Sequence, residues 1–340
     1  MSIPGGTARV HLNEVARHSE SARLVRPSSL FNRSNAMMAT IEKIAEVEAM
    51  VGEGPVWDPD SRTLIWTDIR TGRFFTYDPA TNQNRQVHDG FNVGGFAFNE
   101  FGGLVACIWD GVVLWKSDDE WVRVFDETHE GEPLRFNDVT ADPGGRMFAG
   151  SLIDGGLGKL YRFDPDGSVE VIEEGIGCTN GMGYSPDESI MYYTDSAVRT
   201  IYAYDYDRAT GSVSNRRDFV KLPDTAGVPD GMTVDAEGFV WTAVWFDGCI
   251  VRFDPDGVEE RRIALPAIQT SSVMFGGTDL TDIYVTTAGT SLEPGSPLDP
   301  KDYDWQAYGE HYRGGGLFRV RQDIQGKPEY KARFPWPDSS

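Results

Sequence analysis

Cysteine, histidine and basic residues are scarce in this sequence, and long hydrophobic runs are missing. Three cysteines occur among 340 residues and form no CxxC pair, which predicts free, buried thiols and a reducing compartment. No stretch approaches the roughly 20 apolar residues needed to span a bilayer, and no secretory hydrophobic segment lies near the start. A cytoplasmic protein is therefore expected.

The shortage of basic residues limits the possible partners. Lysine and arginine number 31 against 53 aspartates and glutamates, so the formal net charge is −22 at pH 7. Nucleic acids and anionic membranes both require a basic face, so neither is expected as a partner. A small neutral or cationic ligand is compatible with this charge, and we expect a monomer or weak homo-oligomer.

Several common catalytic motifs are also missing. The run Gly183-Tyr-Ser-Pro-Asp lacks the last glycine of a nucleophile elbow. The run 175–180 lacks the last glycine of a dinucleotide loop, and no βαβ pattern surrounds it. P-loop and HExxH motifs do not occur, and the five histidines show no metal-ligand spacing. These chemistries are set aside.

Turn residues and short strands are abundant instead. Glycine occurs 38 times and proline 19 times, between segments of β-branched and aromatic residues such as 63–67, 190–194 and 282–286. Strand openings recur about 40 to 50 residues apart, the spacing of four-stranded propeller blades. The six openings begin at Gly54, Gly95, Asp138, Gly181, Gly231 and Ser272. We predict an all-β, six-bladed β-propeller.

The ends of the chain suggest how the ring closes. A propeller must close its ring or leave strand edges exposed. The alternating run Ile41–Val47 is expected to form the outer strand of the last blade beside the C-terminal segment, although its Glu, Lys and Ala residues also favour a helix. The propeller is expected to span 41–340. Residues 1–40, rich in arginine and serine, are expected to be an extension, a leader, a targeting segment or a disordered segment.

The connection 290–316 in the last blade is unusually long and rich in aromatic residues. Loops of this length are uncommon in compact domains unless they serve a function or are disordered. We interpret it as a lid or specificity loop over the channel mouth. A packed surface feature or a subunit contact is the alternative.

One polar residue precedes the opening in four of the repeats. These residues are Glu53, Asn137, Asn180 and Asp230, whereas blade two has Gly94 and blade six a serine. Each would by itself be a turn former, but a shared repeat phase brings all four to one point of a closed ring. Carboxylate and amide oxygens suit a hard divalent cation. We expect one divalent metal ion, which the donor set leaves open as calcium, zinc, manganese or iron(II).

Four motifs carry a family resemblance. They are Gly52–Trp57, Arg135–Asp138, Thr179–Met182 followed by Ser185-Pro-Asp-Glu, and Pro229–Met232. From about residue 41 to 320 the chain resembles the senescence marker protein/gluconolactonase/luciferin-regenerating-enzyme-like family of six-bladed propellers. The resemblance implies metal-dependent hydrolysis of an aldonolactone of the gluconolactone, xylonolactone or arabinolactone type. It also implies Glu53, Asn180 and Asp230 as metal ligands, and Arg135 and Asn137 as contacts to the substrate.

This chemistry agrees with the residue types. A bound divalent cation polarises a lactone carbonyl, and a carboxylate can take the proton that the attacking water loses. Asp230 is the candidate general base, and a small-molecule sugar lactone is the expected partner. Two alternatives remain open: a metal-dependent phosphotriesterase or aryl esterase on the same propeller, and a non-enzymatic interaction scaffold.

Overall fold

The computed structural model describes residues 40–126, 135–153, 156–290 and 311–337, the backbone of two short strands at 128–129 and 132–133, and residues 304, 306 and 309. The chain divides into two units, Met1–Met38 and Ala39–Ser340, and all described residues belong to the second. The prediction for residues 1–40 therefore falls outside the described residues, except at Thr40.

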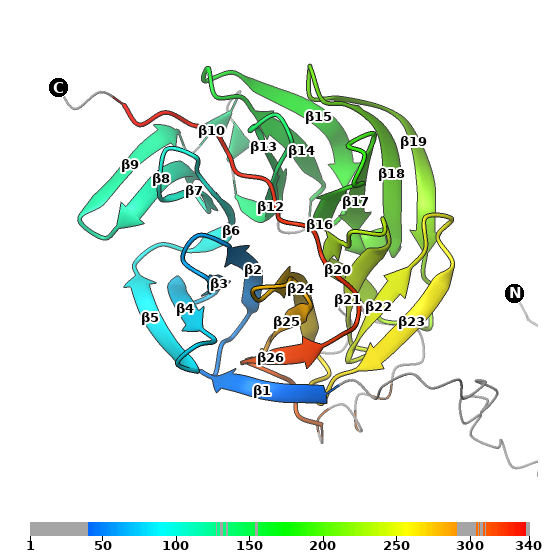
Figure 1. Ribbon diagram of the computed structural model, residues 1–340. Coiled ribbons are helices and arrows are strands. Elements are labelled where there is room, and N and C mark those ends of the chain that lie inside the picture. Colours follow the sequence, from blue (N-terminus) through cyan, green and yellow to red (C-terminus); the bar gives the residue numbers. More distant parts are fainter. Residues whose placement is uncertain are drawn as a thin grey trace, which may run out of the picture. The chain divides into compact units, whose positions relative to one another are not determined.

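Six four-stranded antiparallel sheets are arranged as blades in a ring, with the first strand of each blade at the centre (Figure 1). Blade one consists of β2 (Gly52–Asp58), β3 (Thr63–Asp68), β4 (Arg73–Asp78) and β5 (Gln83–Asp89). Blade two consists of β6 (Val93–Phe98), β7 (Leu104–Ile108), β8 (Gly111–Ser117) and β9 (Glu120–Phe125). Blade three consists of β12 (Phe136–Ala141), β13 (Met147–Ser151), β14 (Gly158–Phe163) and β15 (Val169–Ile176).

Blade four consists of β16 (Thr179–Tyr184), β17 (Ile190–Asp195), β18 (Thr200–Asp207) and β19 (Ser212–Lys221), with the 3-10 helix η1 (Ser196–Val198) after β17. Blade five consists of β20 (Val228–Val234), β21 (Val240–Trp245), β22 (Cys249–Phe253) and β23 (Glu259–Ala264). Blade six consists of β24 (Thr270–Gly276), β25 (Asp282–Thr287), β26 (Gly316–Arg321) and β1 (Thr40–Glu46). The strands β10 (Thr128–His129) and β11 (Glu132–Pro133) form a separate pair. The predicted all-β six-bladed propeller is confirmed.

The ring closes as predicted. Strand β1 pairs antiparallel with β26, from Thr40 opposite Arg321 to Glu46 opposite Gly316. An N-terminal strand thus completes the blade that the C-terminal part of the chain begins, and the helical alternative for this run is wrong. Edge pairing wins over helix propensity because it satisfies the free backbone groups of β26.

Glycine lets the first strands approach one another closely around the channel. A Cβ at Gly94 would lie 2.2 Å from the carbonyl oxygen of Phe136 in the next blade. A Cβ at Gly181 would lie 2.6 Å from the carbonyl oxygen of Asp230. Side chains larger than hydrogen would force these strands apart, so the glycines in the openings hold the channel narrow.

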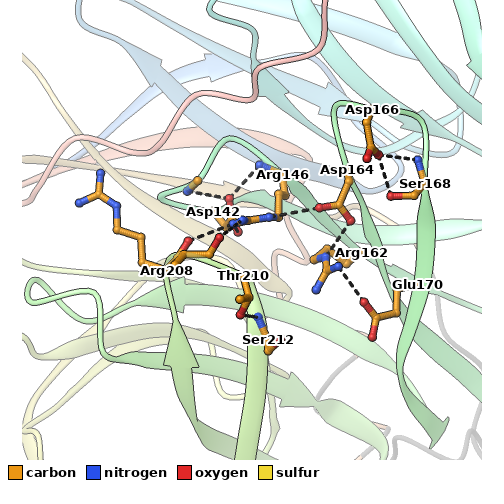
Figure 2. A network of polar contacts seen from close by, with 12 residues as sticks. Asp142, Arg146, Arg162, Asp164, Asp166, Ser168, Glu170, Arg208, Thr210 and Ser212 are labelled. Carbon is orange, nitrogen blue, oxygen red and sulfur yellow. Dashed lines mark hydrogen bonds and ion pairs between the residues drawn. The ribbon is translucent and has the colours of Figure 1, made fainter.

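On the face where the first strands end, a network of ion pairs and hydrogen bonds joins blade three to blade four. Arg146 Nη1 donates to Asp142 Oδ2 over 2.9 Å, and Arg146 Nη2 donates to the carbonyl oxygen of Ala209 in blade four over 2.8 Å. Figure 2 shows Arg146 between Asp142 and Asp164, which lies 3.2 Å from Arg146 Nε. Tyr206 of blade four also donates to Asp142 over 2.7 Å. This network therefore fixes blade three against blade four.

A C-terminal strap, residues 322–337, crosses this same face (red in Figure 1). Its Ala332 exchanges backbone hydrogen bonds with Phe98 and Glu100 of blade two, and Gln325 accepts one from Ala236 of blade five. Glu329 accepts a hydrogen bond from Thr233 over 2.8 Å and lines a small cavity of about 50 Å³ within the channel. The strap thus connects blades at this end and leaves the other end as the mouth.

Asp68 at the end of β3 anchors the chain that enters blade one. Its carboxylate accepts hydrogen bonds from the backbone of Met50 and Val51, at 3.1 and 3.0 Å. It also accepts from Thr71 Oγ1 at 2.7 Å and Arg73 Nη2 at 2.9 Å. Burial would raise the pKa of Asp68, but these donors together hold it below its usual value.

Replacing Asp68 by asparagine should destabilise the protein at pH 7 by about 1–3 kcal/mol, because donors to a buried charged acceptor lose their partner. The lowered folded-state pKa means that this stabilisation is complete above the unfolded pKa of about 4 and is lost as pH falls through the folded pKa. Urea unfolding at pH 7 and at decreasing pH should therefore show the gap between the wild type and D68N narrowing in acid. Asp89→Asn, an exposed change in the same blade, is the control and should stay within about 0.5 kcal/mol of the wild type. An equal loss in both variants would contradict this assignment.

Candidate functional site

A β-bulge lies near the start of every first strand in the ring. The register shifts between Glu53 and Val56 in blade one, and between Asn180 and Met182 in blade four. The corresponding shifts in the other blades are Val93/Gly95, Phe136/Val139, Pro229/Met232 and Thr270/Ser272. Bulges re-aim side chains and often occur next to active sites. The common repeat phase of the polar residues in the sequence is therefore a common bulge in the structure.

These bulges surround a cavity of about 180 Å³ at the channel mouth. All five residues predicted from the sequence line it: Glu53, Arg135, Asn137, Asn180 and Asp230. Glu53, Asn180 and Asp230 are each only 5 or 6% exposed, so their oxygen atoms are largely shielded from bulk water. The remaining lining residues are Val51, Ile69, Arg70, Trp109, Phe136, Leu152, Cys178, Ser196, Val228, Trp245 and Thr290.

The pKa values of three carboxylates in and beside this cavity are raised. For Glu53, burial is the largest cause, followed by the charges of Asp230 and then Asp138, and its pKa lies well above the usual value. For Asp230, burial and then the charge of Asp138 raise the pKa in the same way. Burial raises the pKa of Asp138 to about 7. Protons or a bound cation must therefore offset this repulsion at neutral pH.

The residues present fit a hard cation. Among the described residues, no group of three or more His, Cys, Asp or Glu side chains is placed to hold a metal. A cation at the mouth would therefore rely on the carboxylates of Glu53 and Asp230 together with the amide oxygen of Asn180. Two carboxylates and a neutral oxygen suit an ion such as calcium or manganese and leave positions for water and substrate.

Hydrogen bonds hold the two asparagines together. Asn137 Nδ2 donates to Asn180 Oδ1 over 3.1 Å and to the carbonyl oxygen of Thr179 over 2.7 Å. Asn180 Nδ2 donates to Ser196 Oγ over 2.8 Å. The asparagine predicted to face the substrate thus contacts one of the predicted metal ligands directly.

At the rim, two arginines lie over one aromatic ring. The guanidinium carbon of Arg135 is 4.4 Å from the centroid of the Trp109 ring, and that of Arg70 is 6.0 Å from it. Stacking on an aromatic face orients a guanidinium while its edge can still donate hydrogen bonds. Arg135 is thereby held against an aromatic wall of the cavity.

Sequence reasoning missed four residues of this region. Arg70, Trp109 and Ser196 line the cavity, and Asp138 adds its charge to those of Glu53 and Asp230. Asp138 directly follows Asn137, and in the sequence it marks only a strand opening. Trp109 and Ser196 follow second strands, in the loops that return to the mouth, and that shared position is the signal that could have found them.

The cysteines and the last-blade loop complete the surroundings. All three cysteines are free, as predicted, with Cys107 and Cys249 buried in the core. Cys178 lines the cavity, and burial raises its pKa to about 12, so the thiol is neutral at pH 7. Thr290 also lines the cavity, but residues 291–303 lie outside the described part of the chain, and the lid remains a prediction. No helix within the described residues has the length and apolar character to cross a membrane.

The fold and the site define a class: a six-bladed propeller whose channel mouth presents carboxylates, amides and an arginine to a small molecule. Residues 51–289 match the SMP-30/Gluconolactonase/LRE-like region. The chain belongs to this family, as its motifs indicated.

Individual relatives agree with this assignment. The chain is 40% identical over 297 residues to the pentonolactonase XacC of Haloferax volcanii, in a match that covers 86% of this chain and 98% of that protein. Among solved structures, a luciferin-regenerating enzyme matches with a TM-score of 0.78 and 28% identity over 87% of this chain and all of that one. A calcium-binding protein, regucalcin from Agrobacterium tumefaciens, matches with a TM-score of 0.76 and 25% identity over 86% of this chain and 97% of that one.

The stability of the metal-free protein should fall as pH rises from about 4 to about 7. In the folded state Glu53, Asp138 and Asp230 keep their protons to higher pH than in the unfolded chain, because their pKa values are raised, that of Asp138 to about 7. Thermal unfolding after chelation should show this decline, and Asp138→Asn should make it shallower. A divalent cation should raise the melting temperature more at pH 8 than at pH 5. Asp89→Asn is the control and should leave the decline of melting temperature with pH unchanged. If Asp138→Asn also left this decline unchanged, Asp138 would not be one of the groups that keep a proton in the folded state.

Proposed function

We propose that the protein hydrolyses a sugar lactone of the aldonolactone type to the sugar acid, with one divalent cation at the channel mouth. One observation carries the proposal: five residues from four blades, including two buried carboxylates and an arginine, line a single small cavity. The name of the Haloferax relative, a pentonolactonase, supports this reaction class. Glu53, Asn180 and Asp230 would hold the cation, which when bound supplies Lewis-acid polarisation of the lactone carbonyl.

Asp230 acts as the general base. Its carboxylate lines the cavity beside the proposed cation, where it can accept the proton of an attacking water. Its carboxylate takes a proton from the attacking water as the water oxygen bonds to the carbonyl carbon. The bond between the carbonyl carbon and the ring oxygen then breaks, and the ring oxygen leaves as a hydroxyl group with the proton that Asp230 returns. The new carboxylic acid releases its remaining proton to water. The product is an open-chain carboxylate.

Arg135 and Asn137 bind and orient the lactone. The guanidinium stacked on Trp109 presents a rigid set of donors to the oxygens of the sugar and to the developing carboxylate. Asn137 uses its amide nitrogen on Thr179 and Asn180, so its own oxygen is the atom available to accept from a sugar hydroxyl. The rings of Trp109 and Trp245 provide the apolar wall for the ring carbons.

Acid release from a panel of pentono- and hexonolactones tests the reaction. Turnover should disappear on chelation and return with calcium, manganese, zinc or iron(II), and Asp230→Asn should lower kcat by about 10²–10⁴-fold, the usual contribution of a general base. Glu53→Gln should weaken cation binding. Asp166→Asn, which changes an exposed turn carboxylate, is the matched control and should retain full activity.

The same assay separates the other candidate functions. Hydrolysis of phosphotriesters or aryl esters without lactone turnover would favour the esterase function on the same propeller. A protein that turns over no substrate, and whose function is unaffected by chelation, by Glu53→Gln or by Asp230→Asn, would favour a binding scaffold. Either result would overturn the proposal.

Arg135→Lys should reduce kcat/KM for the preferred lactone by roughly 10- to 100-fold, the equivalent of losing one hydrogen bond from a charged donor. Lysine keeps the charge but loses the planar fork that stacks on Trp109. Steady-state kinetics at saturating cation measure this, and unchanged cation affinity would show that the loss lies in substrate binding. Wild-type kinetics for this variant would remove Arg135 from the site.

A further inference from the structure

We infer that Ser196 is a positioning residue that fixes which atom of Asn180 faces the cation. This inference rests on the proposed function, because it concerns one of the three proposed ligands. Ser196 is fully buried at the start of η1, beside the cavity, and none of the four sequence motifs contains it.

The direction of the hydrogen bonds determines the orientation of the amide. Ser196 Oγ lies 2.5 Å from the carbonyl oxygen of Pro229. A carbonyl oxygen only accepts, so the single hydroxyl proton of Ser196 must point to Pro229. The oxygen of Ser196 is then available to Asn180 only as an acceptor. The atom of Asn180 that lies 2.8 Å away must therefore be the nitrogen, and the amide oxygen must face the other way.

Asn137 is likewise oriented by a backbone carbonyl oxygen, on the other side of Asn180. Asn137 Nδ2 lies 2.7 Å from the carbonyl oxygen of Thr179, which again only accepts. The same nitrogen donates to Asn180 Oδ1 over 3.1 Å. Two backbone carbonyls, those of Pro229 and Thr179, thus set the orientation of both amides. Flipping Asn180 would place its NH₂ group against the NH₂ group of Asn137 and leave Ser196 without its donor.

Other contacts hold Ser196 itself in place. Asp195, immediately before it, accepts hydrogen bonds from the backbone of Gly177, Cys178 and Ala197 at 3.1, 3.0 and 3.1 Å. The backbone N–H of Ser196 donates to the carbonyl oxygen of Cys178 over 2.9 Å. These hydrogen bonds fix the turn that carries the Ser196 hydroxyl. The hydrogen bond from this hydroxyl to Pro229 also connects blade four to the residue that precedes Asp230. Partners of this kind commonly affect metal affinity by roughly 10- to 100-fold.

The chain offers a matched control in blade six. Ser271 is also fully buried, and its hydroxyl lies 2.6 Å from the carbonyl oxygen of Gly52, the residue before Glu53. Its other partner is the hydroxyl of Thr286 at 3.0 Å rather than an amide. Ser271→Ala removes the same kind of buried hydroxyl beside a proposed ligand without touching the orientation of an asparagine.

Calorimetric titration with calcium and with manganese tests the inference. Ser196→Ala should raise the Kd for the cation by about 10- to 100-fold. Ser271→Ala should leave this Kd within about threefold of the wild-type value. Saturating cation should restore most of the kcat of Ser196→Ala, since the residue acts through the ligand and not on the substrate. In the Asn180→Asp background, which has no amide nitrogen to orient, Ser196→Ala should cost no further affinity. Equal Kd values in the wild type and Ser196→Ala, or equal losses in Ser196→Ala and Ser271→Ala, would overturn the inference.

A metal-free measurement separates this inference from the proposed function. In NMR spectra of the chelated protein, the side-chain NH₂ protons of Asn180 should be shifted and protected from exchange in the wild type and in Ser271→Ala, but not in Ser196→Ala. If the wild type bound no cation, the proposed metal-dependent function would be wrong. The NMR measurement would still show whether Ser196 orients the amide of Asn180. If Ser196→Ala fails to fold, Ser196→Cys takes its place, because a thiol is a weaker acceptor of similar size. Its Kd for the cation and the exchange protection of the Asn180 NH₂ protons should then lie between those of the wild type and those of a protein without this hydrogen bond. A Kd and a protection equal to those of the wild type would overturn the inference.

Discussion

The close approach of six first strands around one channel is the constraint on which the rest of the structure depends. Backbones that come this near leave no room for a Cβ at Gly94 or Gly181. Each strand carries a bulge, and in blades one, three, four and five this bulge places a polar side chain at the mouth. The blades thus form a site simply by packing, and the residue at the bulge of each blade sets what that site contains.

Packing at this density makes the mouth electrostatically strained. Carboxylates on blades one, three and five share a region with little water. The charges of Asp230 and Asp138 raise the pKa of Glu53, and the charge of Asp138 raises that of Asp230. Such an arrangement costs stability unless a positive charge or protons balance it. A cation at the mouth would relieve this repulsion, which is why Glu53 and Asp230 are among its proposed ligands.

The amides and the arginine give the site its direction. Each has one end fixed by a specific partner. The nitrogen of Asn137 donates to the carbonyl oxygen of Thr179. The nitrogen of Asn180 donates to the hydroxyl of Ser196, which itself donates to Pro229. The guanidinium of Arg135 lies over the face of Trp109. The opposite ends then face the cavity with defined chemistry. At the far end of the channel, Asp142, Arg146 and the C-terminal strap hold blades together without contributing to this site.

Local sequence determined the blade count, the closing strand and the set of polar residues at the mouth. Strand alternation and a repeat of about 40 to 50 residues are properties of neighbouring residues, so the repeat phase by itself aligns Glu53, Asn180 and Asp230. Tertiary structure alone decided that Asp138 shares their electrostatics, that Arg135 stacks on Trp109 and that Ser196 orients Asn180. Those relations join side chains from different strands and blades. Their hydrogen-bond directions and pKa values exist only once the ring has closed and water has been excluded.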